Sequence, residues 1–122
     1  MASILVVDDD DIVREVFKEF LEIDKHDVCL AESGDLAQEF AEKKQYDLII
    51  VDIIMPGKEG LDTIKDLLSC QPNCKVIACT GKNYQDGYNS LRAAEVVGAC
   101  GVLQKPFTLS DLQELLKSTL DA

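Results

Sequence analysis

Short apolar runs alternate with longer amphipathic segments along the whole chain. Five of these runs are rich in β-branched residues and leucine and end at polar or turn residues, as buried strands do. They cover residues 4–7, 28–31, 48–51, 76–79 and 100–103. After each run, apolar residues recur with the period of a helix. The helical segments fall within residues 12–21, 36–41, 61–68, 91–97 and 109–120.

Five strand–helix units in alternation predict a parallel sheet covered by helices on both faces. Five units close no barrel, so we expect an open, doubly wound α/β fold of the flavodoxin-like type. The strand order 2-1-3-4-5 suits five strands and places strands 1 and 3 side by side at the switch point. The length of 122 residues is that of one compact domain, and we expect a single domain over residues 1–122.

Cap and turn residues mark where several helices begin. Asp10 or Asp11 can cap the first helix. Thr108 or Ser110 can cap the last one. Gly60 opens the third helix, after a turn that contains a proline and a glycine.

The chain is acidic, with a formal net charge of −11. This charge makes it a poor binder of nucleic acids and anionic membranes, because those partners attract clustered lysine and arginine. No apolar segment approaches the roughly 20 residues that span a bilayer, and the first residues lack the basic region of a secretory signal. We therefore expect a cytoplasmic protein with no membrane partner and no direct nucleic-acid partner.

The sequence contains five cysteines, which are Cys29, Cys70, Cys74, Cys79 and Cys100. An odd number without a secretion signal does not indicate a disulfide framework. Cys70 and Cys74 are four positions apart, but a zinc site needs two more soft ligands, and His26 is distant and expected in a surface turn. We favour ordinary thiols, and the three cysteines in or beside predicted strands should be buried apolar residues.

Polar groups with compatible chemistry follow four of the five predicted strands. In chain order these groups are Asp8 and Asp9, Asp52, Thr80 and Lys105. Because parallel strands align their carboxyl ends, these side chains should meet at one edge of the sheet. Crowded carboxylates repel one another, and a divalent cation that prefers oxygen ligands, such as Mg²⁺, relieves that repulsion. A nucleophilic carboxylate, a hydroxyl and an ammonium group around Mg²⁺ together suit a phosphoryl group.

The arrangement closely resembles the receiver domain of two-component response regulators, of the stand-alone type. The resemblance covers essentially the whole chain. The matching residues are Asp8-Asp9 after the first strand, Asp52 in Asp52-Ile53-Ile54-Met55-Pro56-Gly57, Gly60, Thr80, Gly98-Ala99 and Lys105-Pro106-Phe107.

This resemblance implies that Asp52 accepts a phosphoryl group from a histidine kinase or a phosphotransfer protein. It implies that Mg²⁺, or Mn²⁺ in its place, is held by Asp8, Asp9 and Asp52. The backbone carbonyl of Ile54 would complete the protein's share of the ligands.

The resemblance also assigns roles to the other two polar groups. Thr80 would be the switch hydroxyl that moves toward the phosphoryl group. Lys105 would pair with a phosphoryl oxygen, and its peptide bond to Pro106 is expected to be cis. Such a domain is not an enzyme acting on other substrates. It catalyses only its own phosphorylation and dephosphorylation and shifts the face that binds a downstream protein target.

Two positions depart from the family pattern. The family usually has an aromatic residue three positions before the lysine, where this chain has Val102. The segment from Thr80 to Gly98 is also a few residues longer than usual and contains Tyr84 and Tyr88. We favour a tolerated surface insertion over a partner contact by these tyrosines, because loops accept insertions at low cost.

Two other interpretations remain open from the sequence. Asp8 and Asp10 also resemble the nucleophile and the acid of haloacid-dehalogenase-type phosphatases, which generally need additional chain for a cap. A receiver that acts as a constitutive scaffold, without phosphorylation, would fit the presence of Val102. Its mutually repelling carboxylates would then have no visible purpose.

Overall fold

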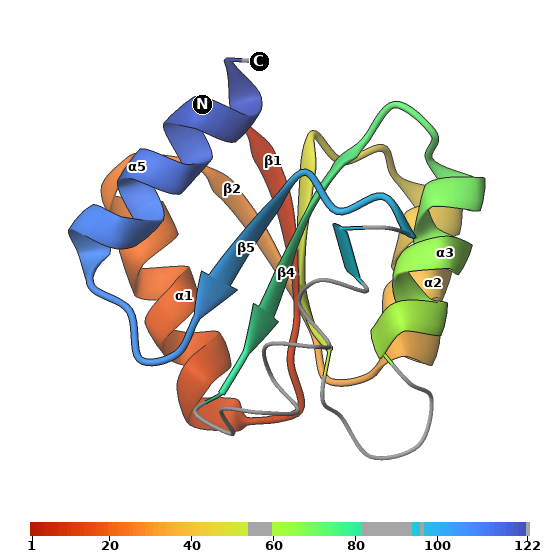
Figure 1. Ribbon diagram of the computed structural model, residues 1–122, viewed down its shortest axis with the longest axis horizontal. Coiled ribbons are helices and arrows are strands. Elements are labelled where there is room, and N and C mark those ends of the chain that lie inside the picture. The colour runs from red at the N-terminus through yellow and green to blue at the C-terminus, as the bar shows by residue number, and fades with distance from the viewer. Residues whose placement is uncertain (54–59, 82–93, 96, 122) are drawn as a thin grey trace.

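The computed structural model describes residues 1–53, 60–81, 94–95 and 97–121 (Figure 1). Its strands are β1 (Ser3–Val7), β2 (Asp27–Ala31), β3 (Leu48–Asp52), β4 (Lys75–Thr80) and β5 (Gly101–Gln104). Its helices are α1 (Asp11–Ile23), α2 (Gly34–Lys43), α3 (Gly60–Cys70) and α5 (Leu109–Leu120). Residues 94, 95 and 97 also have helical backbone, within the segment where the sequence predicts a fourth helix.

All neighbouring strands pair in parallel, in the order β2-β1-β3-β4-β5. This confirms the predicted fold class and strand order. Helices α1 and α5 cover one face of the sheet, and α2 and α3 cover the other (Figure 1). The strands therefore point their carboxyl ends toward one common edge, opposite to the edge where the two chain termini lie.

The sheet separates two hydrophobic cores. The core under α1 and α5 includes Phe17, Leu21, Leu112 and Leu116. The core under α2 and α3 includes Ala37, Ala41, Ile64 and Leu67. β3 contributes alternate residues to both cores, and all five of its residues are buried. Its sequence is an unbroken apolar run up to Asp52 because neither face of this strand meets water.

The structure decides which residues cap the first and last helices. Asp10 caps α1, and its Oδ1 accepts hydrogen bonds from the backbone N–H groups of Ile12 and Val13. Thr108 caps α5 in a reciprocal arrangement with Asp111, whose side chain accepts from the Thr108 backbone. These caps satisfy backbone donors that have no partner within the helix.

The prediction for the strand cysteines is confirmed for Cys79 and wrong for Cys100. Cys79 is fully buried in β4, whereas Cys100 is exposed because β5 begins one residue later, at Gly101. Cys29 is half-buried, since it lies on β2, an edge strand. Burial raises the pKa of the Cys79 thiol to about 12, so the thiol stays protonated.

Several predictions fall on residues outside those that the structure describes. They concern the Ile54 carbonyl and the tyrosines Tyr84 and Tyr88. Within the described residues, no helix is both long enough and apolar enough to cross a membrane.

Candidate phosphoryl-acceptor site

Three acidic side chains gather where β1 and β3 end. Asp52 is the last residue of β3, and Asp8 and Asp9 directly follow β1, which lies beside it. One carboxylate oxygen from each of the three lies within 4.8 Å of the other two. Asp8 is 1% exposed and Asp52 is 5% exposed, while Asp9 is exposed to solvent. At this separation two carboxylates repel by about 3 kcal/mol at an effective dielectric constant of about 20.

Lys105 lies between the two buried carboxylates. Its Nζ donates to Asp8 Oδ2 over 2.7 Å and to Asp52 Oδ2 over 3.2 Å. Burial by itself lowers the pKa of Lys105, but the hydrogen bond to Asp8 and the charge of Asp52 outweigh it. The pKa of this ammonium group is therefore raised above its ordinary value, and Lys105 is charged throughout the physiological range.

The backbone holds Lys105 at this position. Its peptide bond to Pro106 is cis, as expected, and its N–H donates to the Thr80 carbonyl oxygen over 2.7 Å. The turn after β5 is thereby tied to the end of β4. Lys105 pairs with both buried carboxylates, and Asp9 adds a third, exposed carboxylate to the cluster.

Thr80 is the last residue of β4 and is fully buried. Its Oγ1 has no hydrogen-bond partner among the described residues. A buried hydroxyl without a partner costs free energy, and this cost is removed when an acceptor enters the site. The structure brings Asp8, Asp9, Asp52 and Lys105 into one cluster and places Thr80 at the neighbouring strand end, with its backbone bonded to Lys105.

Position 60 requires a glycine because the start of α3 lies very close to the backbone of Ile53. A Cβ atom at this position would lie 2.2 Å from the Cα of Ile53, the residue that follows Asp52. No side chain fits at that distance, so the first turn of α3 packs directly on the backbone after the acidic residue. This contact is the physical reason for a glycine at position 60, one of the residues that carry the resemblance to receiver domains.

Arg14 belongs to this edge, although the sequence pattern does not single it out. Its Nη1 donates to the backbone carbonyl of Asp8 over 2.6 Å, and its Nη2 pairs with the carboxylate of Asp11. The only sequence signal is the spacing of three residues between Asp11 and Arg14, which suits a pair on one helix face. The bond to the Asp8 carbonyl depends on how β1 meets α1 and has no signature in the sequence.

The structure argues against the phosphatase interpretation. Asp10, the acid in that mechanism, is occupied as the cap of α1. Asp8, its nucleophile, has one oxygen bonded to the Asp10 N–H and the other to Lys105. Asp52, by contrast, ends the central strand within the acidic cluster.

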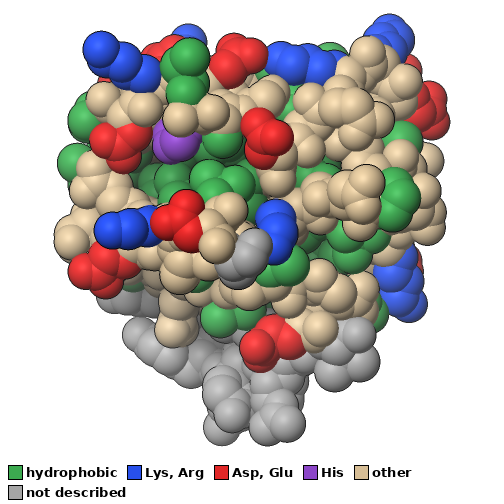
Figure 2. All heavy atoms as spheres, turned by 90° about the horizontal axis from the view of Figure 1, so that it is seen from above, with side chains coloured by type: hydrophobic (Ala, Val, Ile, Leu, Met, Phe, Trp, Pro, Cys, Tyr) green, Lys and Arg blue, Asp and Glu red, His purple; other side chains and the backbone are tan. Residues whose placement is uncertain are grey.

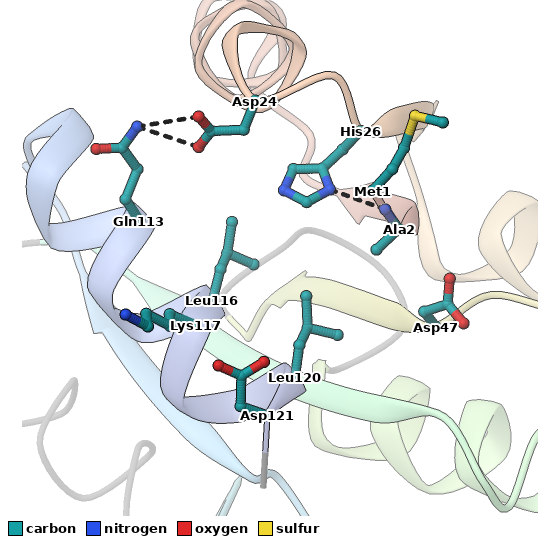
Figure 3. Close-up of a pocket in the computed structure, with 10 residues that line it drawn as sticks. All are labelled: Met1, Ala2, Asp24, His26, Asp47, Gln113, Leu116, Lys117, Leu120 and Asp121. Atoms are coloured by element: carbon teal, nitrogen blue, oxygen red, sulfur yellow. Dashed lines mark hydrogen bonds between the residues drawn. The ribbon is translucent and has the colours of Figure 1, made fainter.

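A cavity of about 690 Å³ opens at the opposite edge of the sheet, near the chain termini. Figure 2 looks onto this edge, where apolar side chains line a hollow among charged ones. Leu116 and Leu120 of α5 face His26 across the cavity (Figure 3). His26 lies in the turn before β2, as expected, but it is half-buried and its Nδ1 accepts a hydrogen bond from the Ala2 N–H.

A parallel five-stranded α/β fold with clustered carboxylates and a lysine at its carboxyl edge defines a CheY-like signalling domain. The family model of the response regulator receiver domain matches residues 4–117. The chain therefore belongs to the response regulator receiver family.

Individual relatives agree with this assignment. The chain is 27% identical over 120 residues to the chemotaxis protein CheY of Halobacterium salinarum, covering 98% of each chain. It is 32% identical over 111 residues to a cyclic di-GMP phosphodiesterase of Thermotoga maritima, covering 91% of this chain but only 29% of that protein. The crystal structure of a CheY-like receiver domain from Methanospirillum hungatei superposes with a TM-score of 0.90 at 27% identity, covering 99% of this chain and 94% of the other.

Receiver domains are signalling modules of two-component systems and not enzymes in the usual sense. They bind Mg²⁺ at an acidic pocket and interact with histidine kinases or phosphotransfer proteins and with downstream targets. The cluster of Asp8, Asp9 and Asp52 could hold such a metal ion.

Proposed function

We propose that this chain is a single receiver domain over residues 1–122 whose phosphoryl acceptor is Asp52. The observation that carries the proposal is the geometry around Asp52. Its carboxylate belongs to a group of three within 4.8 Å and shares Lys105 with Asp8. A cluster of three carboxylates favours a divalent cation and, through that cation and Lys105, a phosphoryl group.

Asp8, Asp9 and Asp52 would hold Mg²⁺ together with the backbone carbonyl of Ile54, and Mn²⁺ fits the same oxygen ligands. The donor set supports this assignment, because Mg²⁺ prefers a few carboxylates and leaves room for water and phosphate oxygens. The bound cation supplies positive charge that stabilises the phosphoryl oxygens during transfer.

In the transfer step, an oxygen of Asp52 forms a bond to phosphorus while the phosphorus–nitrogen bond of the donor histidine breaks. The electron pair of the broken bond returns to the imidazole ring, and the product is an acyl phosphate on Asp52. Lys105 moves its hydrogen bond from the carboxylate to a phosphoryl oxygen. The Thr80 hydroxyl, which has no partner among the described residues, donates to another.

The donor protein would approach the acceptor over α1 and the turn after β5. An apolar pocket of about 280 Å³ lies there, lined by α1 residues, Lys105, Pro106 and Phe107. Ile12 borders this pocket and is 75% exposed, which is unusual for isoleucine. An apolar contact at Ile12 would hold a histidine kinase or phosphotransfer protein beside the acceptor.

The output of this domain would be a change in the face presented to an unidentified downstream protein. Val102 is 36% exposed on β5 and cannot act as the rotating aromatic that the family usually has there. Movement of Thr80 toward the phosphoryl group would therefore act through the end of β4 and the backbone bond to Lys105. The proposed setting is the cytoplasm, with no nucleic-acid or membrane partner.

Acetyl phosphate labelling followed by intact-mass spectrometry tests the proposal. We expect the wild-type chain to gain the mass of one phosphoryl group when Mg²⁺ is present and none in EDTA. The Asp52→Asn variant should gain none under either condition, whereas Asp47→Asn, at the opposite edge of the sheet, should label like wild type. Labelling of Asp52→Asn at the wild-type level would show that Asp52 is not the acceptor.

A further inference from the structure

The guanidinium group of Arg14 holds the loop that carries Asp8 and Asp9. It donates to the Asp8 carbonyl oxygen over 2.6 Å and pairs with the Asp11 carboxylate. The Arg14 side chain is only 13% exposed, and that of Asp11 is 87% exposed. One planar group thus bridges both ends of the acidic segment between β1 and α1, with a separate nitrogen for each acceptor, a geometry that the single nitrogen of a lysine does not reproduce.

The Asp8 carbonyl belongs to the peptide group that joins Asp8 to Asp9. A peptide group is planar, so a hydrogen bond that fixes its oxygen also fixes the position of the following Cα atom. On the other side of the residue, the Asp8 N–H donates to the Ala31 carbonyl over 3.1 Å. The backbone around Asp8 is therefore held from two directions, by β2 and by Arg14.

Asp9 depends on this backbone more than Asp8 does. The Asp8 carboxylate is fixed by the Asp10 N–H and by Lys105. The Asp9 side chain has no hydrogen bond or ion pair within the described parts of the chain, yet it lies in the acidic cluster. Its place there follows from the orientation of the Asp8–Asp9 peptide.

We infer that Arg14 is a positioning residue for the cation site, which rests on the function proposed above. Arg14 does not touch the cation. It fixes the Asp8–Asp9 peptide so that the Asp9 carboxylate is presented toward the cation beside those of Asp8 and Asp52.

The direction in which cation affinity changes when Arg14 is replaced distinguishes a positioning role from an effect of its charge. The Arg14 guanidinium repels a nearby divalent cation, so removing its charge would by itself raise cation affinity. Loss of positioning lowers the affinity, and removing groups that orient metal ligands typically costs about 10- to 100-fold. A purely structural role would lower the melting temperature and leave the affinity unchanged.

Titration with Mn²⁺, followed by the electron paramagnetic resonance signal of the free ion, tests this inference. We expect Arg14→Gln to bind Mn²⁺ about tenfold more weakly than wild type. Arg14→Lys keeps the charge but replaces the planar two-nitrogen fork by one nitrogen on a shorter side chain, so it should also bind more weakly. Lys117→Gln makes the same charge change as Arg14→Gln on an exposed part of α5 and should bind like wild type.

Arg14→Gln binding as tightly as wild type, or more tightly, would overturn the inference, and so would wild-type affinity in Arg14→Lys. Thermal melts in EDTA establish that each variant is folded, and Arg14→Lys carries the test if Arg14→Gln is not. Absence of Mn²⁺ binding by the wild type, or undiminished binding by Asp52→Asn, would refute the cation site and the role of Arg14 with it. If the wild type binds Mn²⁺, Asp52→Asn binds it more weakly and the Arg14 variants bind it as tightly as wild type, the cation site stands and only the role of Arg14 is refuted.

Discussion

The two edges of the sheet use the same polar residue types in opposite ways. At the carboxyl edge, the carboxylates of Asp8, Asp9 and Asp52 crowd one another, and Lys105 pairs with those of Asp8 and Asp52. At the amino edge, Asp47 accepts a hydrogen bond from the Ser3 N–H over 2.8 Å and belongs to no such cluster among the described residues. A carboxylate bonded to a backbone donor stabilises the fold, whereas one held among like charges stores free energy that a ligand can release.

Gln71 shows the same contrast within the buried residues. It is 1% exposed, and its side chain accepts from the Tyr46 N–H and donates to the carbonyls of Ala41 and Lys44. These bonds join α2, the start of β3 and the end of α3 at the amino edge. Buried Thr80 at the carboxyl edge has an unpartnered hydroxyl among the described residues. The Gln71 side chain is thus fully bonded, whereas the Thr80 hydroxyl is left open for a ligand; the Ser3 hydroxyl at the amino edge also lacks a partner among the described residues.

The largest expected effect comes from Lys105→Met. The change leaves two buried carboxylates without their cation and should lower the free energy of unfolding by about 3 kcal/mol in EDTA. Saturating Mg²⁺ should recover part of this loss, since binding to the folded state alone is stabilising. Urea denaturation in both conditions measures the effect. Lys117→Met is the control and should change the free energy of unfolding by no more than about 0.5 kcal/mol. An equally small effect of Lys105→Met would mean that Lys105 does not pair with the two carboxylates as described.

At the amino edge, Gln71→Met should lower the free energy of unfolding by about 2 kcal/mol, because it leaves buried backbone groups without partners. The loss should be the same in EDTA and in Mg²⁺, unlike that of Lys105→Met. Gln113→Met, at a half-buried position of the same edge, is the matched control. A Gln71→Met loss that Mg²⁺ reverses would contradict the separation of the two edges.

Asp52→Asn should stabilise the metal-free protein by about 1 kcal/mol, because it removes a like charge and a buried carboxylate while its amide oxygen still accepts from Lys105. The gain is modest because Lys105 already offsets part of the repulsion. Thermal melts in EDTA measure it, with Asp47→Asn as the comparison at the other edge. A clear drop in the melting temperature of Asp52→Asn would show that the attraction to Lys105 exceeds the repulsion.

The smallest expected effect is the pH dependence contributed by His26. Burial and the nearby amino terminus lower the pKa of His26 below 6.5, although Asp24 opposes them. The unfolded chain then binds a proton that the folded chain does not, so stability declines as the pH falls through about 6.5. Between about pH 7.5 and about pH 5.5, the melting temperature of wild type should fall more than that of His26→Gln. Parallel curves for the two proteins would exclude this contribution.

The sequence by itself determined the parallel sheet and most of its chemistry. A short, unbroken apolar run rich in β-branched residues, such as that of β3, is typical of a strand in the middle of a sheet covered on both faces. Alternation with helices makes the strands parallel, and parallel strands carry their terminal residues to one edge. For this reason the meeting of Asp8, Asp52 and Lys105 was predictable before any coordinates, although 97 residues separate Asp8 from Lys105.

Only the tertiary structure decided which of these charged side chains pair with each other and which neighbouring residues hold them in position. The pattern did not distinguish Asp10 from Asp11 as the cap of α1, because both can accept the same backbone bonds. It placed Cys100 in a strand, where a shift of one residue in the start of β5 turns it toward solvent. It gave no sign of the bond from Arg14 to the Asp8 carbonyl, because a periodic pattern records which face of an element is apolar and not where one side chain meets the backbone of another segment.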